Sequence, residues 1–254
     1  VPSLSVVVPC YNEEGSLEWF LPQLAAEASG FSDFEIILVD DASRDRSPQI
    51  IAALAPRFGL RVITNSVNLG LGGAMRRGFD AARLDWLTYF PADGQVPAEE
   101  VRKFAPFMGG YDLIVGRRTA TPDYTRYRRI ASRVYTSWVS LAFGLRISDF
   151  NWMQAWRRSL WTAYGSRANS VFICGEFLVR SQQARPRMVE IEVGYQPRHA
   201  GQAKNGSPKA ALRAAADIAR VFSEESLAGR FHFLHPTVPD RAVTAPEIRR
   251  QAAA

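Results

Sequence analysis

The chain has 254 residues, the size of one large domain or two small ones. Hydrophobic residues make up 47% of it, which is typical of a globular protein with a sizeable core. The formal net charge is +6, a balance that suits contact with phosphate groups, anionic membranes or nucleic acid. No zinc-finger, RRM or KH signature is present, so we expect no nucleic-acid partner.

Strand and helix patterns alternate along residues 4–115. Short apolar runs of the kind that form buried strands occupy residues 4–9, 34–39, 60–64, 84–90 and 111–115. Apolar residues recur at helical spacing over 17–28, 48–58 and 97–108, and a glycine-rich turn at 68–73 leads into a helix that ends at 82. Ser47 followed by Pro48 is typical of a helix N-cap. This alternation predicts an α/β fold whose mostly parallel central sheet is flanked by helices.

The second half of the chain has a different pattern. Residues 127–143 are predicted to form a helix with one apolar face, made of Ile130, Val134, Trp138 and Leu141. Residues 188–195 alternate like a strand. Residues 208–222 form an alanine-rich helix that also carries Lys209, Arg213 and Arg220. From residue 234 the chain is rich in proline and polar residues, which predicts a loose tail.

The cysteines and the length of the apolar runs indicate in which compartment the protein is expected. Cys10 and Cys174 are far apart and belong to no CxxC pair, which argues against a disulfide framework and a zinc site. No apolar run reaches the ~18 residues that a membrane span requires, and the first residues enter a strand pattern without a basic leader. We therefore expect a cytoplasmic protein, with any membrane contact peripheral and at the inner face.

Polar residues follow three of the predicted strands. Tyr11, Asn12 and Glu13 follow the first strand, Asp40 and Asp41 the second, and residues 93–95 the fourth. In parallel α/β sheets, ligands bind beyond the carboxyl ends of the strands. Two adjacent carboxylates repel each other unless hydrogen-bond donors bind them, and ribose hydroxyls and base N–H groups are such donors. The sequence leaves open which of the two aspartates contacts a ligand.

Three motifs in this order resemble the family 2 glycosyltransferases: VVVPCYNEEGSL at 6–17, VDDASRDRS at 39–47 and NLGLGGAMRRGFDAA at 68–82. The closest likeness is to dolichyl- and polyprenyl-phosphate sugar transferases such as dolichol-phosphate mannosyltransferase, over residues 3–205. This resemblance implies a GT-A domain at 1–205, with a nucleotide-sugar-binding half at 1–118 and an acceptor-side half at 119–205. A helical extension at 206–230 and a flexible tail at 231–254 are expected to follow.

The resemblance also implies a set of donor-binding residues: Pro9, Tyr11, Asn12, Glu13, Asp40, Asp41, Gly72, Ala92, Asp93 and Gln95. Residues 91–95 stand in the place of the DxD motif, which in the family holds a divalent cation on the diphosphate. Pro91 occupies the position of the first aspartate, which leaves Asp93 and Gln95 as the implied ligands. Oxygen ligands suit Mg²⁺ or Mn²⁺.

The same resemblance implies these catalytic residues: Asp93, Arg118, Arg128, Asp149, Arg198 and Lys204. Arginine forks suit phosphate oxygens, and Arg198 and Lys204 belong to a segment similar to the family's R-x-x-G-x-S-K, with Ala203 in place of serine. A phosphate acceptor is already a nucleophile at neutral pH, so Asp149 is expected to orient the acceptor rather than to remove a proton.

The implied activity is the inverting transfer of a hexose from a UDP- or GDP-sugar to a dolichyl or undecaprenyl phosphate, in the synthesis of cell-envelope glycans. Two alternatives remain: a transferase that acts on a sugar hydroxyl or a protein, and a non-catalytic protein that binds nucleotide sugars. Residues 134–145 and the helix at 208–222 would rest on an anionic membrane or, equally, pack as core and dimer-facing helices. A homodimer and a membrane partner protein are both compatible with the sequence.

Overall fold

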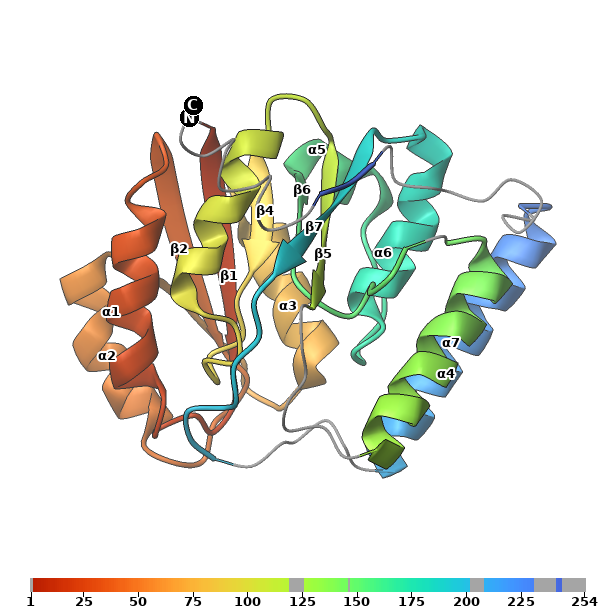
Figure 1. Ribbon diagram of the computed structural model, residues 1–254. Coiled ribbons are helices and arrows are strands. Elements are labelled where there is room, and N and C mark those ends of the chain that lie inside the picture. Colours follow the sequence, from red (N-terminus) through yellow and green to blue (C-terminus); the bar gives the residue numbers. More distant parts are fainter. Residues whose placement is uncertain (1, 119–125, 146, 202–207, 231–240, 244–254) are drawn as a thin grey trace.

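The computed structural model describes residues 2–118, 126–145, 147–201, 208–230 and 241–243 (Figure 1). Four strands from the first half are parallel neighbours: β1 (Ser3–Cys10), β2 (Asp33–Asp40), β3 (Arg61–Thr64) and β4 (Trp86–Tyr89). β1 pairs with β2 on one side and with β4 on the other. The carboxyl ends of β1, β2 and β4 therefore meet at one edge of the sheet, as the strand-end clusters predicted.

The sheet continues through strands from the second half: β5 (Leu113–Arg118), β6 (Gln154–Arg157), β7 (Met188–Val193) and β8 (Arg241–Val243). Within the described residues the strand order is β3-β2-β1-β4-β6-β5-β7-β8. β6, which the sequence did not predict, lies antiparallel between β4 and β5. The mostly parallel sheet predicted from the sequence is thus confirmed, with one reversed strand at its centre.

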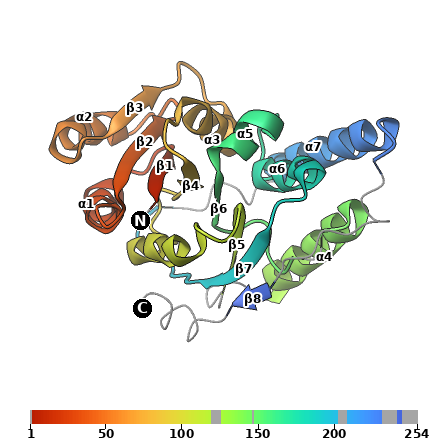
Figure 2. The ribbon, with the colours of Figure 1, turned by 90° about the horizontal axis from the view of Figure 1, so that it is seen from above.

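Helical segments cover both faces of this sheet. They are α1 (Leu17–Ala28), α2 (Ser47–Phe58), α3 (Gly70–Ala81), η1 (Ala98–Phe107), α4 (Arg126–Phe143), α5 (Arg158–Tyr164), α6 (Ile173–Ser181), η2 (Gln182–Ala184) and α7 (Pro208–Leu227). Figure 2 shows α1 and η1 on one face and α3, α5 and α6 on the other. α4 and α7 lie together at the side of the molecule away from α2 (Figures 1 and 2). No helix within the described ranges is long and apolar enough to cross a membrane.

The predicted inward faces of the helices form the core. In α1 all five apolar residues at helical spacing are buried: Leu17, Phe20, Leu21, Leu24 and Ala28. The segment predicted at 97–108 is a 3-10 helix, and its Val101, Phe104 and Met108 are buried as expected. Burial of apolar surface is the main favourable contribution to folding, at roughly 25 cal/mol per Å². These helices are therefore held to the sheet by their apolar stripes.

The structure tests two local predictions, the helix cap at Ser47 and the apolar face of α4. The predicted cap at Ser47 is wrong, because Ser47 is the first residue of α2 and Arg46 occupies the N-cap position. Its buried hydroxyl instead accepts a hydrogen bond from the backbone N–H of Glu13 at 2.9 Å. The predicted apolar face of α4 is confirmed, but it points to solvent: each of its members is more than half exposed, namely Ile130, Val134, Trp138 and Leu141.

Candidate functional site

A pocket of about 440 Å³ lies beyond the carboxyl ends of the central strands. Its walls come from the segments after β1, β2 and β4, from residues 169–171, from Arg198 and from the first turns of α7. Seven of the predicted donor-binding residues line it: Pro9, Tyr11, Glu13, Asp41, Ala92, Asp93 and Gln95. The sheet topology thus gathers residues that are up to about 200 positions apart in the chain.

Asn12 does not line the pocket but shapes the loop that does. Its φ of 51° is in the left-handed region, which asparagine tolerates better than most residues. Its backbone N–H donates to Ser43 Oγ at 3.0 Å, and its side-chain Oδ1 accepts from the N–H of Arg44 at 2.7 Å. These bonds tie the loop after β1 to the loop after β2 and so position Tyr11 and Glu13 on the pocket wall.

The two aspartates after β2 have separate environments. Asp41, which is 2% exposed, lines the pocket. Its carboxylate accepts hydrogen bonds from Asn65 Nδ2 at 2.7 Å and from the backbone N–H groups of Leu69 and Gly70 at 2.8 and 2.9 Å. Asp40 accepts from the N–H of Ser43 at 3.0 Å. Asp41 therefore fixes the start of α3 at the pocket edge, while Asp40 closes the turn behind it.

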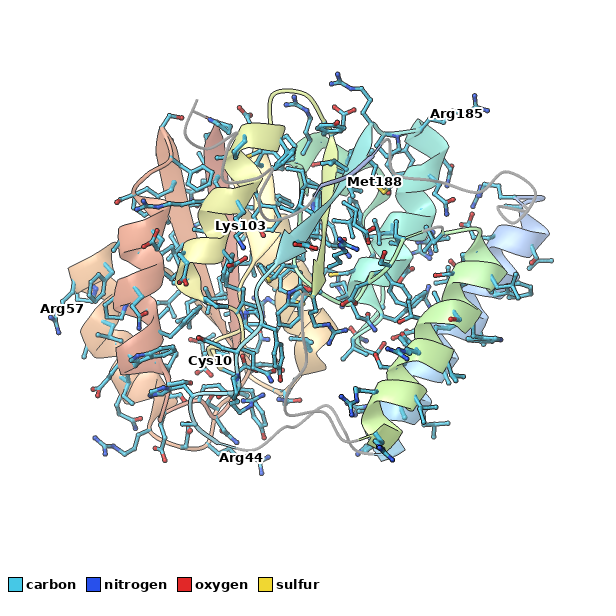
Figure 3. The ribbon with its side chains drawn as sticks, viewed as in Figure 1. Cys10, Arg44, Arg57, Lys103, Arg185 and Met188 are labelled. Carbon is cyan, nitrogen blue, oxygen red and sulfur yellow. The ribbon has the colours of Figure 1, made fainter. Side chains whose placement is uncertain are left out.

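The pocket floor includes a cysteine that is not suited to nucleophilic chemistry. Burial, together with the negative charges of Asp40 and Glu13, raises the pKa of the Cys10 thiol to about 12. Only the thiolate is strongly nucleophilic. Cys10 is therefore a neutral wall residue at physiological pH. Figure 3 labels Cys10, which lies at the end of β1.

Gly72, one of the implied donor-binding residues, does not line the pocket and is contacted instead by another loop of the chain. A Cβ added at Gly72 would lie 2.5 Å from the carbonyl oxygen of Ala168 and 2.6 Å from that of Ser170. The N–H of Gly72 donates to the carbonyl of Asn169 at 3.2 Å. Gly72 thus admits the loop at 168–170 against α3, while its neighbours Gly70 and Leu71 are the residues that line the pocket.

Arg198 bridges two carboxylates inside the pocket. Its Nη1 lies 2.9 Å from Glu13 Oε1, and its Nη2 lies 2.7 Å from Asp93 Oδ2. All three side chains are largely buried. The structure therefore brings together three predicted residues that lie after β1, after β4 and after β7, and one guanidinium is shared by two carboxylates.

The segment that carries Arg198 runs along residues 93–95. The N–H groups of Gln196 and His199 donate to the carbonyls of Gln95 and Asp93 at 2.9 and 3.1 Å. The His199 ring stacks on Trp19 of α1, with ring centroids 4.2 Å apart and planes within 1° of parallel. This stack and the two backbone bonds hold Arg198 over the pocket.

The implied metal ligands offer one carboxylate and one amide. Asp93 Oδ1 accepts the backbone N–H of Gln95 at 3.0 Å, and the side-chain Nε2 of Gln95 donates to Tyr195 Oη at 3.0 Å. Within the described residues, no group of three or more His, Cys, Asp or Glu side chains is arranged to hold a metal ion. Mg²⁺ is commonly held by one or two carboxylates together with substrate phosphates and water. Asp93 and Gln95 thus fit the part of such a ligand set that a protein supplies, with phosphate and water oxygens as the other ligands.

Two of the other predicted catalytic residues, Arg118 and Asp149, pair with each other. Arg118 and Asp149 form a bidentate pair, with Nε 2.6 Å from Oδ2 and Nη2 3.0 Å from Oδ1. The Arg118 guanidinium also lies over the Trp152 ring, 5.2 Å from its centroid. Neither Arg118 nor Asp149 lines the pocket. Arg128 lies in the first turn of α4, and Lys204 lies outside the described residues.

Sequence reasoning missed one wall of the pocket. Lys209, Ala210 and Arg213 of α7 line it, as do residues 169–171. The four-residue spacing of Lys209 and Arg213 places them on one helix face, and this spacing was the available signal. Residues 169–171 carry no comparable signal, because their position depends on contacts with α3 and α7.

Solved structures with the same fold include glucosyl-3-phosphoglycerate synthase from Mycobacterium tuberculosis in two complexes. The complex with phosphoglyceric acid has a TM-score of 0.65 at 18% identity and covers 87% of this chain and 80% of that one. The complex with Mn²⁺, UDP and phosphoglyceric acid has a TM-score of 0.68 at 17% identity and covers 87% and 78%. The predicted GT-A fold is confirmed by this likeness.

Curated relatives add a likeness in sequence. One from Aeromonas hydrophila is 34% identical over 209 residues, which cover 80% of this chain and 63% of the relative. One from Pseudomonas paraeruginosa is 35% identical over 207 residues, which cover 79% and 60%. Both are named undecaprenyl-phosphate 4-deoxy-4-formamido-L-arabinose transferase. The chain thus spans about three fifths of the length of these relatives.

The profile of one family, "Glycosyl transferase family 2", matches residues 5–173, which include most of β1 and all of β2 to β6. The match contains the three sequence motifs and the strand-end wall of the pocket. This chain belongs to glycosyl transferase family 2.

Proposed function

We propose that this chain is an inverting glycosyltransferase that moves a hexose from a nucleotide diphosphate sugar to a polyprenyl phosphate at a membrane surface. The observation that carries the proposal is the pocket beyond β1, β2 and β4, where Tyr11, Glu13, Asp93 and Arg198 meet. The likeness to relatives named for transfer to undecaprenyl phosphate supports the acceptor class.

The donor would lie across the strand ends. Tyr11 offers an aromatic face for the base, and Glu13 offers hydrogen-bond acceptors for base or ribose. The three hydrogen bonds that Asp41 accepts from the chain suit a supporting role, in which it holds the edge of α3 against the nucleoside. Asp93 and Arg198 then lie where the diphosphate is expected.

The chemistry is a single displacement at C1 of the sugar. An oxygen of the acceptor phosphate forms a bond to C1, the bond from C1 to the diphosphate oxygen breaks, and the nucleoside diphosphate leaves with the electron pair. Attack occurs opposite the leaving group, so the configuration at C1 inverts. Negative charge develops on the diphosphate, and a preorganised cation such as Arg198 stabilises it. Arg118, Arg128 and Lys204 remain proposed contacts for the two phosphate-bearing substrates.

Asp149 is proposed to orient the acceptor. Its two hydrogen bonds from Arg118 fix the orientation of the carboxylate. We expect Asp149→Asn to keep most activity towards a phosphate acceptor, measured as initial rates of sugar transfer. A loss of about 10²-fold or more would favour general-base chemistry on a hydroxyl acceptor instead.

Asp93 and Gln95 are proposed to hold a Mg²⁺ or Mn²⁺ ion that arrives with the donor. The diphosphate and water would complete its ligands, since the chain supplies one carboxylate and one amide. When bound, such an ion neutralises charge on the leaving diphosphate. Asp93 also pairs with Arg198, so the proposed ion and the arginine would share one carboxylate.

The exposed apolar face of α4 is proposed to contact the membrane that contains the lipid acceptor. Ile130, Val134, Trp138 and Leu141 face solvent on this helix, and its exposed basic residues include Arg126 and Arg129. Amphipathic helices with cations beside an apolar face bind anionic membrane surfaces. A location at the inner face of the membrane stays a prediction.

The test is sugar transfer from labelled UDP-, GDP- and dTDP-sugars to geranyl phosphate, with the lipid product extracted into organic solvent. We expect labelled lipid with one donor, and an Asp93→Ala rate lower by about 10²- to 10³-fold. Asp33→Ala is the matched control, because Asp33 is exposed at the opposite end of β2. Donor binding without turnover on any acceptor would favour a non-catalytic protein, and full activity of Asp93→Ala would contradict the assigned site.

A further inference from the structure

The first turns of α7 face the pocket. Lys209 and Arg213 line it together with Asp93 and Arg198. Arg213 Nη1 lies 3.9 Å from where a Cβ on Gly70 would stand, so its guanidinium reaches the start of α3. α7 lies beyond residues 5–173, the part that matches the family profile. The α7 wall of the pocket therefore comes from a part of the chain that the family profile does not match.

α7 is fixed in this position by a buried carboxylate on α6. Glu176 is 0% exposed, and Oε2 lies 2.9 Å from Arg220 Nη2 of α7. The same oxygen accepts hydrogen bonds from Ser166 Oγ at 2.9 Å and from the N–H of Ala168 at 2.7 Å. Glu176 thus ties α7 and the loop at 166–168 to one point.

A second contact lies one helical turn closer to the pocket. Asp217 of α7 accepts the backbone N–H of Ser170 at 3.2 Å. Arg213, Asp217 and Arg220 recur at spacings of four and three residues, so they share one face of α7. The face that carries Arg213 into the pocket is the face that is anchored.

The charges within the pocket indicate what this wall binds. Glu13 and Asp93 are paired with Arg198, and Asp41 accepts hydrogen bonds from Asn65, Leu69 and Gly70. Among the described residues, no ion pair joins Lys209 or Arg213 to a carboxylate, and both side chains are exposed towards solvent. A lysine and an arginine side by side at a pocket wall match the oxygens of a phosphate group.

We propose that Lys209 and Arg213 bind a phosphate group of a substrate in this pocket, and that the Glu176–Arg220 pair positions them. This inference rests on the proposed function, which supplies two possible phosphate sources. One is the diphosphate of the nucleotide sugar, and the other is the monophosphate of the polyprenyl acceptor. In both cases α7 completes a site whose other wall is built by the strand ends.

The test compares two double variants by calorimetric titration. Lys209→Ala with Arg213→Ala removes the pair, and Arg57→Ala with Arg83→Ala removes two exposed cations far from the pocket. Figure 3 labels Arg57 at the opposite side of the molecule from α7. The probes are UDP, GDP, dTDP, inorganic pyrophosphate and geranyl phosphate. Unfolding midpoints are measured for each variant, and since all four side chains are exposed, these midpoints are expected to be unchanged.

We expect the α7 double variant to bind at least one probe about tenfold or more weakly than the parent, with the control unchanged. Selective loss for nucleotides and pyrophosphate assigns the pair to the donor, and selective loss for geranyl phosphate assigns it to the acceptor. Lys209→Arg with Arg213→Lys retains both charges and is expected to restore most of the affinity.

Parent-like affinity of the α7 double variant for every probe that the parent binds would overturn the inference and leave the proposed function standing. A parent that binds pyrophosphate but none of the nucleotides or geranyl phosphate, with pyrophosphate binding weakened in the double variant, would keep the phosphate site and contradict the proposed function. A parent that binds none of the probes would contradict both.

Discussion

The two walls of the pocket are held in place by different sets of contacts. The strand-end wall, made of Tyr11, Glu13, Asp41 and Asp93, follows parallel strands whose neighbours are fixed by sheet hydrogen bonds and an apolar core. The α7 wall, made of Lys209 and Arg213, is held by the buried Ile218 and Val221 of the same helix and, in addition, by charged groups centred on the fully buried Glu176. One site can thus have one wall positioned mainly by strand pairing and another that also depends on a fully buried carboxylate, and the two walls are expected to differ in their sensitivity to mutation and pH.

The largest expected effect is on the ion-pair network. Glu176→Gln leaves Arg180 and Arg220 without their buried partner, and removing one member of such a pair costs about 3–5 kcal/mol. Urea unfolding monitored by circular dichroism measures this loss. The matched control is Glu27→Gln, which removes the surface partner of Arg102 and is expected to cost less than about 1 kcal/mol. Equal effects of the two variants would contradict the assigned difference between the walls.

The same network predicts how stability depends on pH. Burial alone would raise the pKa of Glu176, but hydrogen bonds from Arg220 and Arg180 outweigh burial and hold it below its ordinary value of 4.5. A carboxyl with a lowered folded-state pKa stabilises the fold fully above its unfolded pKa, and this contribution is lost as the pH falls through the folded pKa. The difference in unfolding free energy between parent and Glu176→Gln should therefore shrink below about pH 4.5. A difference that stays constant down to pH 3 would contradict the assignment of this pH dependence to the Glu176 carboxylate.

The next effect concerns the contact between the walls. Gly72→Ala places a Cβ 2.5 Å from the carbonyl oxygen of Ala168, and overpacking of this kind costs about 1–3 kcal/mol. Gly109→Ala is the control, because an added Cβ there meets nothing within 4 Å. Thermal unfolding of the two variants checks the prediction. A Gly72→Ala protein as stable as Gly109→Ala would show that the loop at 168–170 does not press against α3.

A smaller effect is expected on the strand-end wall. Trp19→Ala removes the stack on His199, and aromatic pairs contribute about 0.5–1.5 kcal/mol beyond their burial. The segment that carries Arg198 should then loosen, which amide hydrogen exchange detects at His199, whose N–H donates to the carbonyl of Asp93. Trp19→Phe keeps a stacking ring and should retain most of the protection. Unchanged amide exchange at His199 in Trp19→Ala would show that the Trp19–His199 stack does not hold the segment that carries Arg198.

The smallest effect on stability is expected at the exposed face of α4. Trp138→Ser should change the unfolding free energy by less than about 0.5 kcal/mol, because the side chain is 54% exposed. It should nevertheless weaken binding to vesicles that contain anionic lipid, measured by co-sedimentation. Val62→Ser, at an exposed site on β3, is the control. Equal vesicle binding by both variants would argue against α4 as the membrane contact.

The sequence predicted the strand-end wall well, because that wall depends on local patterns. Each predicted strand of the first half exists, and seven of the ten proposed donor residues line the pocket. Gly72 and Asn12 do not line the pocket but contact the loops that support its wall. Their roles depend on which loop packs against them, which local sequence patterns do not specify.

The second half was predicted less completely. β6 is four residues long and was not anticipated, because a strand of that length has no clear periodicity. The position of α7 depends on Arg220 meeting Glu176, 44 residues away in the chain. Charges this far apart in sequence give no pairing signal, so the helix was predicted and the wall that it forms was not. The predictions for Lys204 and for most of the tail at 231–254 fall outside the described residues. Within that tail the structure describes Arg241–Val243, which form β8.

The assignment of this pocket to a nucleotide sugar is tested most directly by calorimetric titration of the protein with UDP-, GDP- and dTDP-sugars, each with and without Mn²⁺. We expect selective binding of one nucleotide sugar at one site per chain. Binding strengthened by the ion would assign it to Asp93 and Gln95, and binding indifferent to the ion would assign the diphosphate charge to Arg198 and the other cations of the pocket. Binding of none of the three would contradict the assignment of this pocket as a nucleotide-sugar site.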